Sequence, residues 1–324
     1  MMAAPQWEAP IDKILIAGTG ALATLFAARL SRARVEVTML GSWEAALNAL
    51  NQHGARLQQP DGRVLSGPVR AVRSPKSAGQ HTIALVLVKS WQTARVAQQL
   101  AGCLAEQGVA LTLQNGLGTD EILAQVLGGP RTAAGVTTTG AALLEPGLVK
   151  NGGAGSLELG EHPRVAPLVE LLRTAGFTVN LHADVGALQW GKLVVNAAIN
   201  PLTALYGVPN GALLEDAHLR DLMQKTALET AAVALACGVQ LPYADPVLQV
   251  EQVARRTAAN RSSMLQDLER GAPTEIEAIN GAVVRAAETA GVRAPYNQAL
   301  VAHIQARLHP EKHLPVKIQA MIEG

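Results

Sequence analysis

Residues 13–23 read Lys-Ile-Leu-Ile-Ala-Gly-Thr-Gly-Ala-Leu-Ala. A short, mainly apolar run is followed directly by two closely spaced glycines, Gly18 and Gly20. The run predicts a buried strand, and the pattern after Gly20 predicts a helix that reaches Ser31. In such a turn the first glycine permits a tight bend and the second lets a pyrophosphate approach the backbone; the third position, here Ala23, needs only a small side chain. The stretch therefore predicts a dinucleotide site with the pyrophosphate at the helix N-terminus. Its expected contacts are Gly18, Thr19, Gly20, Ala21, Leu22 and Ala23.

The rest of the first half alternates short apolar strands with helical stretches. Further strands are expected at 35–40, 82–88, 109–114, 135–139 and 155–159. The near-continuous apolar character of 82–88 is typical of a parallel strand that is covered on both faces. We therefore predict an α/β domain with a doubly wound, Rossmann-type parallel sheet over residues 11–183.

After about Asp184 the strand signals stop, and long Ala, Leu and Val patterns of helical period are separated by glycines and prolines. Residues 184–324 are therefore expected to form an all-helical domain. Residues 1–10 have neither the basic region nor the apolar core of a signal peptide, and we expect a disordered leader there.

Composition excludes several function classes. The 324 residues are 48% hydrophobic, and 27 Lys and Arg balance 26 Asp and Glu. No global charge would attract nucleic acid or an anionic membrane, and no apolar run reaches the roughly 18 residues of a membrane span. The two cysteines, Cys103 and Cys237, lie far apart and are expected to be buried free thiols, with no disulfide or zinc site. These features favour a cytoplasmic protein with a small-molecule partner; the sequence leaves the oligomeric state, a homodimer included, undecided.

Polar residues follow three of the predicted strands. Lys89 comes after the strand at 82–88, and Asn115 follows the strand at 109–114. Ligands of open parallel sheets bind beyond the carboxyl ends of the strands, so both side chains are candidates for contacts near the nicotinamide half of the cofactor. Ser42 stands where an NAD-binding chain usually presents a carboxylate to the ribose. The absence of a carboxylate there favours NADPH over NADH, although no arginine stands there to hold a 2′-phosphate, and NAD is not excluded.

One predicted helix carries a single polar stripe on an otherwise apolar surface. Lys192, Asn196 and Asn200 follow one another at four-residue spacing and share one face. Burying an ammonium and two amides without partners would cost several kcal/mol each, roughly, so we expect a substrate to meet the stripe. Desolvation lowers the pKa of a lysine toward the range in which general acids work best, which makes Lys192 the candidate proton donor for a carbonyl oxygen.

A second group of candidates lies later in the helical half. Asn260, Ser263 and Asp267 are expected to share one helix face because they stand at positions i, i+3 and i+7. Thr274 and Glu277 have the spacing of a capping box, which predicts that a helix begins there. Glu275 lies outside the reciprocal bonds of that box and is left free for another role.

With these residues assembled, the chain resembles the 2-dehydropantoate 2-reductase, or ketopantoate reductase, family over nearly its whole length. Five ordered motifs carry the resemblance, which makes coincidence a poor explanation. They are Gly18-x-Gly20-x-x-Ala23; Val88-Lys-Ser-Trp-Gln92; Gln114-Asn-Gly116; Trp190-Gly-Lys192 with Asn196 and Asn200-Pro-Leu-Thr-Ala204; and Ser262-Ser-Met264 with Asp267, leading to Thr274-Glu-Ile276.

The resemblance implies a fold, a reaction and a role for each matching residue. The helical domain would be of the 6-phosphogluconate dehydrogenase C-terminal-like type, and the reaction would make (R)-pantoate from 2-dehydropantoate with NADPH for pantothenate synthesis. Lys192 would be the general acid, and Glu275 would bind the developing hydroxyl and position the lysine. The implied substrate contacts are Asn196, Asn200, Asn260 and Ser263, and the implied nicotinamide-side contacts are Lys89 and Asn115. Many members carry an arginine just after the second strand, where this chain has Ser42 and Trp43.

Two other functions stay open at this point. Relatives can keep the catalytic lysine and change the pocket, so the substrate could be another branched or aromatic 2-oxo acid. A different class is a regulator that binds a dinucleotide without turning it over. The presence of both Lys192 and Glu275 speaks against a regulator, because a sensor needs neither a proton donor nor a partner for it.

Overall fold

The computed structural model describes residues 11–309, which form two compact units. Residues up to Gln114 and from Thr119 to Val185 make up the first unit. The second unit contains residues from Gly186 onward and also the short segment Asn115–Gly118. The leader expected at residues 1–10 lies outside the described residues.

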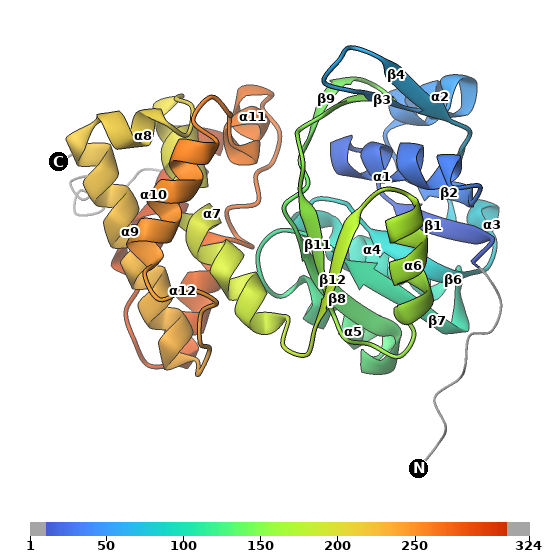
Figure 1. The fold of residues 1–324 in the computed structure, drawn as a ribbon. Coiled ribbons are helices and arrows are strands. Elements are labelled where there is room, and N and C mark those ends of the chain that lie inside the picture. The colour runs from blue at the N-terminus through green and yellow to red at the C-terminus, as the bar shows by residue number, and fades with distance from the viewer. Residues whose placement is uncertain (1–10, 310–324) are drawn as a thin grey trace. The chain divides into compact units, whose positions relative to one another are not determined.

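The first unit is built on an eight-stranded sheet (Figure 1), in the order β12-β11-β8-β7-β6-β1-β2-β5. Its strands are β1 (Lys13–Ala17), β2 (Glu36–Leu40), β5 (Arg70–Val72), β6 (His81–Val86), β7 (Leu104–Thr112), β8 (Thr132–Thr137), β11 (Ser156–Gly160) and β12 (Thr178–His182). The pairs from β5 to β8 are parallel, and β11 runs antiparallel to β8. The predicted doubly wound sheet is confirmed.

Helices cover both faces of this sheet. They are α1 (Ala21–Arg32), α2 (Glu44–His53), α3 (Pro75–Ala78), α4 (Thr93–Ala101), α5 (Thr119–Leu127) and α6 (Ala166–Thr174), with short 3-10 turns at Ser90–Gln92 and Gly129–Arg131. Along β1, Ile14 and Ile16 pack with α1 and α6, whereas Leu15 and Ala17 pack with α4 and α5. A strand covered on both sides has no polar face, which explains the continuous apolar runs of the sequence.

A second, four-stranded sheet lies over α1 and was not anticipated from the sequence. It has the order β4-β3-β10-β9 and consists of β3 (Ala55–Gln58), β4 (Val64–Gly67), β9 (Ala141–Glu145) and β10 (Leu148–Asn151). Leu57 and Val149 are buried in the same cluster as the apolar side of α1. Strands this short carry too few residues for a period-2 pattern to stand out.

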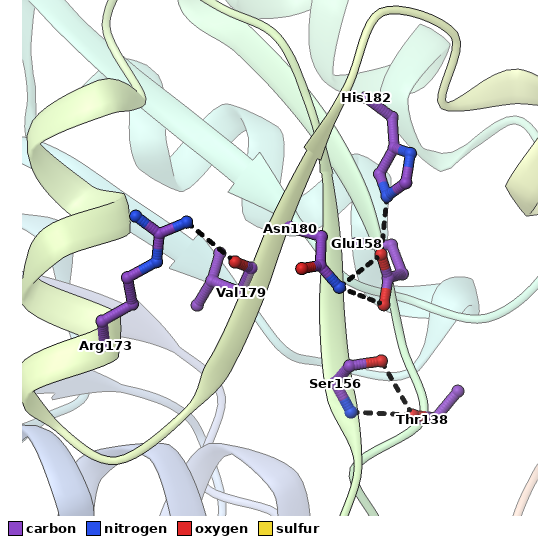
Figure 2. A network of polar contacts seen from close by, with 7 residues as sticks. All are labelled: Thr138, Ser156, Glu158, Arg173, Val179, Asn180 and His182. Atoms are coloured by element: carbon purple, nitrogen blue, oxygen red, sulfur yellow. Dashed lines mark hydrogen bonds and ion pairs between the residues drawn. The ribbon is translucent and has the colours of Figure 1, made fainter.

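A polar network ties together the last two strands before the helical unit (Figure 2). Asn180 Nδ2 donates to both carboxylate oxygens of Glu158 at 3.1 Å, and His182 Nε2 lies 2.6 Å from Glu158 Oε2. On the other side of β12, Arg173 from α6 donates to the carbonyl oxygen of Val179 at 3.0 Å. These bonds join side chains of β12 to β11 and its backbone to α6, and so fix the end of the sheet.

The second unit is helical throughout its described part, as predicted. Its helices are α7 (Gly186–Tyr206), α8 (Ala212–Glu215), α9 (Ala217–Ala236), α10 (Pro246–Arg256), α11 (Ser263–Glu269), α12 (Asn280–Thr289) and α13 (Pro295–Leu308). Leu193 and Ala197 of α7 belong to one apolar cluster, and Val194 and Ala198 belong to another. Helix α7 is therefore the central helix of this unit, with apolar packing on more than one side.

Two other expectations can be compared with the structure. Cys103 is a buried free thiol as expected, but Cys237 is exposed because it ends α9 at the surface, which corrects the prediction for that residue. Within residues 11–309, no helix is long and apolar enough to cross a membrane.

Candidate active site

The glycine turn between β1 and α1 has the geometry that a phosphate cradle needs. Gly18 adopts φ +132°, and a Cβ there would lie 2.9 Å from the carbonyl oxygen of Leu87. Its amide donates to the carbonyl of Leu40 at 2.8 Å, which holds the turn against the end of β2. The same imaginary Cβ would come within 3.3 Å of the Ala23 methyl group, so the small third residue is also required.

The N-terminus of α1 is open to an anion. Gly20 is the N-cap residue, the helix has no side-chain cap, and its first turn carries no acidic residue. A Cβ on Gly20 would meet nothing within 4 Å, so the space in front of the helix is clear. The unbonded first-turn amides and the helix dipole together favour a phosphate, so this part of the chain fits the pyrophosphate of a dinucleotide.

A cationic residue that the sequence did not reveal lies at the end of β2. Arg95 of α4 donates from Nη1 to the hydroxyl of Ser42 at 3.4 Å, across 53 positions of sequence. Arg73 also lies at this side of the sheet, but its guanidinium pairs with Glu44 at 3.2 Å. Arg95 thus brings a guanidinium to the strand end at which sequence reasoning found no arginine; only the fold could reveal it, since α4 is remote in sequence from β2.

Lys89 directly precedes the 3-10 turn Ser90–Gln92 that follows β6. Its side chain is half-buried and lies beyond the carboxyl end of the strand, on the sheet unit. Behind it, Gln114 Nε2 donates to the carbonyl of Val88 at 3.0 Å and to the hydroxyl of Thr93 at 2.9 Å. This amide joins the end of β7 to the segment that carries Lys89.

The predicted polar stripe lies on α7. Lys192 and Asn196 are half-buried, and Asn200 is 8% exposed. Burial lowers the pKa of Lys192 to about 8, and the nearby Glu275 carboxylate opposes this shift by raising the pKa. Near neutral pH the amine is therefore mostly protonated, yet it can release its proton more readily than an exposed lysine can.

Glu275 is brought to this stripe from a turn before α12. It is 5% exposed, and its Oε2 accepts a hydrogen bond of 3.1 Å from Asn115 Nδ2. Asn115 belongs to the segment Asn115–Gly118, which packs in the helical unit, and Leu117 there donates its amide to the carbonyl of Ala278 at 3.0 Å. Asn115 is thus placed beside Glu275, a contact that the sequence had not suggested.

The predicted helix face of Asn260 and Ser263 is wrong in part. Helix α11 begins at Ser263, so Asn260 lies in the preceding loop, where its carbonyl accepts from the amide of Asn210 at 3.0 Å. Ser262 is the N-cap and turns the chain just before the helix, its hydroxyl accepting from the amide of Leu265. Both Asn260 and Ser263 are exposed, whereas Asp267 is buried. The three residues therefore do not form one exposed stripe.

The expected capping box is also wrong. Residues 275–279 form a turn, and α12 begins only at Asn280. The Thr274 hydroxyl is buried and has no hydrogen-bond partner among the described residues, while Glu277 pairs with Gln305 and Arg285. The turn bonds of Ala278 and Ile279 to the carbonyl of Glu275, at 3.1 and 3.0 Å, hold this segment in place of a helix. The Glu277 side chain bonds Gln305 and Arg285 instead of completing the box.

The comparisons with known proteins agree with this arrangement. The family profile described as "Ketopantoate reductase PanE/ApbA" matches residues 14–164, and that described as "Ketopantoate reductase PanE/ApbA C terminal" matches residues 184–308. A curated 2-dehydropantoate 2-reductase from Halobacterium salinarum is 35% identical over 293 residues, which cover 89% of this chain and 96% of the relative.

Solved structures are similar over the same length. A PanE/ApbA family ketopantoate reductase from Ralstonia eutropha JMP134 has a TM-score of 0.86 at 30% identity, covering 93% of this chain and 100% of that one. A ternary structure of D-mandelate dehydrogenase with NADH and anilino(oxo)acetate also has a TM-score of 0.86, but at 24% identity, covering 92% of this chain and 98% of that one. That second likeness shows the fold alone. By its two family profiles and its curated relative, the chain belongs to the ketopantoate reductase PanE/ApbA family.

Proposed function

We propose that this protein reduces 2-dehydropantoate to (R)-pantoate in pantothenate synthesis, with NADPH as the reductant. The observation that carries the proposal is Lys192, a half-buried lysine with a pKa of about 8 on the polar stripe of α7, beside Glu275. Such a group is suited to donate a proton to a carbonyl oxygen that is gaining negative charge. The curated relative's name, 2-dehydropantoate 2-reductase, supports the choice of substrate.

The residues have the following proposed roles. When bound, a nicotinamide dinucleotide would supply the hydride for the keto carbon, and Lys192 Nζ would give its proton to the keto oxygen. Glu275 accepts a hydrogen bond from the new hydroxyl and keeps Lys192 protonated, while Asn115 holds the Glu275 carboxylate. Amides bind hydroxyl and carboxylate groups without adding charge. The proposed substrate contacts are Asn196, Asn200, Asn260 and Ser263, and Lys89 is proposed to contact the cofactor. We assign dinucleotide binding to residues 11–183 and substrate binding to residues 184–324.

We further propose that the nicotinamide dinucleotide is NADPH rather than NADH. The end of β2 carries Ser42 in place of a carboxylate, and the Arg95 guanidinium lies beside it. A carboxylate would repel a 2′-phosphate, whereas a hydroxyl and a guanidinium can both donate to one. Arg95 would thus supply the positive charge for a 2′-phosphate at this strand end.

The direct test of the reaction follows the absorbance of reduced nicotinamide with 2-dehydropantoate, using NADPH and NADH in parallel and other 2-oxo acids as controls. Rapid oxidation of NADPH by 2-dehydropantoate alone is the expected result. Preference for another 2-oxo acid would overturn the substrate and leave the reductase chemistry standing. Dinucleotide binding with no turnover of any oxo acid would indicate a regulator.

The test of the cofactor choice is Arg95→Ala, read by fluorescence titration of NADPH and NADH. Loss of a charge-assisted hydrogen bond of about 1.5–3 kcal/mol should raise the Kd for NADPH roughly 10- to 150-fold. The Kd for NADH should stay within about twofold, because that cofactor has no 2′-phosphate. An equal effect on both cofactors would remove Arg95 from phosphate recognition.

Two coarser features complete the proposal. We place the protein in the cytoplasm, which is consistent with two free cysteines, one of them exposed. We also propose a homodimer, for which the exposed Leu228 and Leu235 of α9 offer an apolar face. Light scattering on the purified protein tests the second point, and a monomer at micromolar concentration would reject it.

A further inference from the structure

Helix α7 contains a proline in its interior, directly after the polar stripe. Pro201 has no N–H group, so it cannot donate to the carbonyl oxygen of Ala197, four residues earlier. Ala197 lies between Asn196 and Asn200 in sequence, on a side of α7 that is fully buried. A buried carbonyl without a donor is costly, so another group must fill this place.

Asn280, the first residue of α12, supplies the donor for the carbonyl of Ala197. Its Nδ2 donates to the carbonyl oxygen of Ala197 at 3.0 Å, across 83 positions of sequence, and the residue is 0% exposed. The second Nδ2 hydrogen goes to Oδ1 of Asn297 at 2.9 Å. The Asn280 Oδ1 atom has no hydrogen-bond partner among the described residues, so this side chain serves α7 as a donor only.

A second layer of bonds fixes Asn280 in this orientation. Asn297 of α13 donates from Nδ2 to Glu229 Oε1 at 2.8 Å and to the hydroxyl of Thr230 at 3.1 Å. Glu229 also accepts the backbone amides of Tyr296 and Asn297, at 2.9 and 2.8 Å. The amide of Asn297 therefore cannot turn over without losing these bonds, and its oxygen must face Asn280.

From these contacts we infer that Asn280 is a positioning residue, which supplies the hydrogen bond that Pro201 removes from α7 and so sets the relative placement of Asn196 and Asn200. The inference rests on the proposed function only in so far as those two amides bind the substrate. Lys192 lies farther toward the N-terminus of α7, beyond Asn196. Loss of the Asn280 bond should therefore disturb substrate binding more than proton transfer.

The test is a double-mutant cycle between Asn280→Leu and Pro201→Ala. An alanine at 201 restores the N–H that can donate to Ala197 within the helix. In the wild-type background we expect Asn280→Leu to raise KM for the 2-oxo acid on the order of tenfold, with kcat reduced about threefold at most. In the Pro201→Ala background the same change should raise KM less than about threefold, because the carbonyl already has its donor.

Three further readouts separate positioning from general damage. The Kd for NADPH and the alkaline limb of the pH profile near pH 8 should not change, because neither depends on the Ala197 carbonyl. Asn51→Leu is a control in the sheet unit, where the exposed Asn51 likewise donates from Nδ2 to a backbone carbonyl, that of Ala71 at 2.9 Å. It should lower the Tm and leave KM for the oxo acid unchanged.

Each outcome decides the matter. Equal rises in KM in the two backgrounds, or a fall in Tm with no change in KM, would overturn the inference. If Asn280→Leu does not fold alone, Asn280→Ser leaves room for a water and should show the same dependence on Pro201, with smaller changes. If the wild-type protein turns over no 2-oxo acid, the proposed function fails, but the double-mutant cycle can still be measured by thermal unfolding. Asn280→Leu should then lower the Tm by several degrees in the wild-type background and by clearly less in the Pro201→Ala background.

Discussion

At the scale of single residues, the proposed chemistry would depend on two opposing influences on the pKa of Lys192. Burial lowers the pKa of its amine, Glu275 raises it, and the result is about 8. At pH 7 the ammonium form is therefore the major one, by about tenfold. Protonated Lys192 also destabilises the folded protein, because the Lys192 amine binds its proton more tightly in the unfolded chain than in the folded one.

Substitution Lys192→Met should separate these two effects. Removal of the proton donor should lower kcat/KM at least about 100-fold, with little change in the Kd for NADPH. Below pH 8 Lys192 is protonated in both the folded and unfolded states; between pH 8 and about 10.4 only the unfolded state holds the proton. The free energy of unfolding of the wild type, relative to the variant, should thus rise as the pH increases through this window.

Urea unfolding of both proteins at pH 7 and pH 9.5 measures this difference. A difference in unfolding free energy that does not depend on pH would show that the amine is not desolvated in the folded protein. Turnover near the wild-type value would exclude Lys192 as the general acid.

Substitution Glu275→Gln tests the electrostatic partner. Because Glu275 raises the pKa of Lys192, loss of its charge should lower that pKa further, and the alkaline limb of kcat/KM should move from about pH 8 to lower pH. The glutamine retains an oxygen that can accept from Asn115, so the packing is conserved. A limb that stays in place, measured across pH 6 to 9.5, would argue against coupling between the two groups.

At the scale of elements, α1 begins without a side chain that caps the backbone amides of its first turn. An N-cap side chain is usually Ser, Thr, Asp or Asn, and this helix instead begins after Gly20. The missing bonds are the ones that a phosphate can make. The helix thus lacks the small stabilisation of a side-chain cap, which fits the proposed pyrophosphate position.

Substitution Gly20→Asp should therefore move stability and binding in opposite directions. The backbone at φ −83° and ψ −169° suits an aspartate cap, and a new Cβ meets nothing within 4 Å. We expect the unfolding free energy to hold or to rise by a few tenths of a kcal/mol, roughly, because the side chain caps α1. The Kd for NADPH should rise at least about 100-fold, because the carboxylate occupies and repels the phosphate position.

Thermal unfolding and fluorescence titration measure the two effects, and Gly18→Ala is the contrast. Gly18 has φ +132° and no space for a Cβ, so this variant should lose both stability and binding. Tight NADPH binding by the Gly20→Asp protein would mean that the pyrophosphate does not rest on α1.

At the scale of the whole molecule, the chain enters the helical unit twice. Residues 115–118 belong to that unit although the chain on both sides of them belongs to the sheet unit. The segment places Asn115 within hydrogen-bond distance of Glu275. It can come this close because Gly116, which has no side chain, lies against the backbone of Ala278. Within the helical unit, this short loop thus places Asn115 against the candidate catalytic group.

Substitution Gly116→Ala should displace this loop. Gly116 has φ +86°, and a Cβ would come within 2.1 Å of the Ala278 carbonyl oxygen, so strain and overlap act together. We expect a loss of about 2 kcal/mol or more in unfolding free energy and a fall in kcat as Asn115 leaves Glu275.

The matched control is Gly118→Ala in the same loop. Gly118 has nearly the same φ, +87°, but its Cβ would meet nothing within 4 Å. It should cost only the backbone strain, about 1 kcal/mol, and should leave kcat close to wild type. Equal losses in the two variants, in urea unfolding and steady-state assays, would show that contact with Ala278 is unimportant.

The sequence by itself was sufficient wherever a local pattern carries the information. The turn at Gly18 and Gly20 and the apolar run of β1 are set by backbone sterics and by burial on both faces. The stripe on α7 follows from helical period alone, and α7 continues as one helix past Pro201. In each case the residues that define the feature are neighbours in the chain, so no distant contact is needed to recognise it.

Tertiary structure decided the features that depend on distant partners. Thr274 and Glu277 have the spacing of a cap, yet the Glu277 side chain bonds the distant Gln305, and the helix begins only at Asn280. The approach of Arg95 to Ser42 and of Asn280 to Ala197 joins residues 53 and 83 positions apart. Spacing along the chain cannot show such pairs, because they form only when separate elements pack together and each buried polar group must find a donor or acceptor.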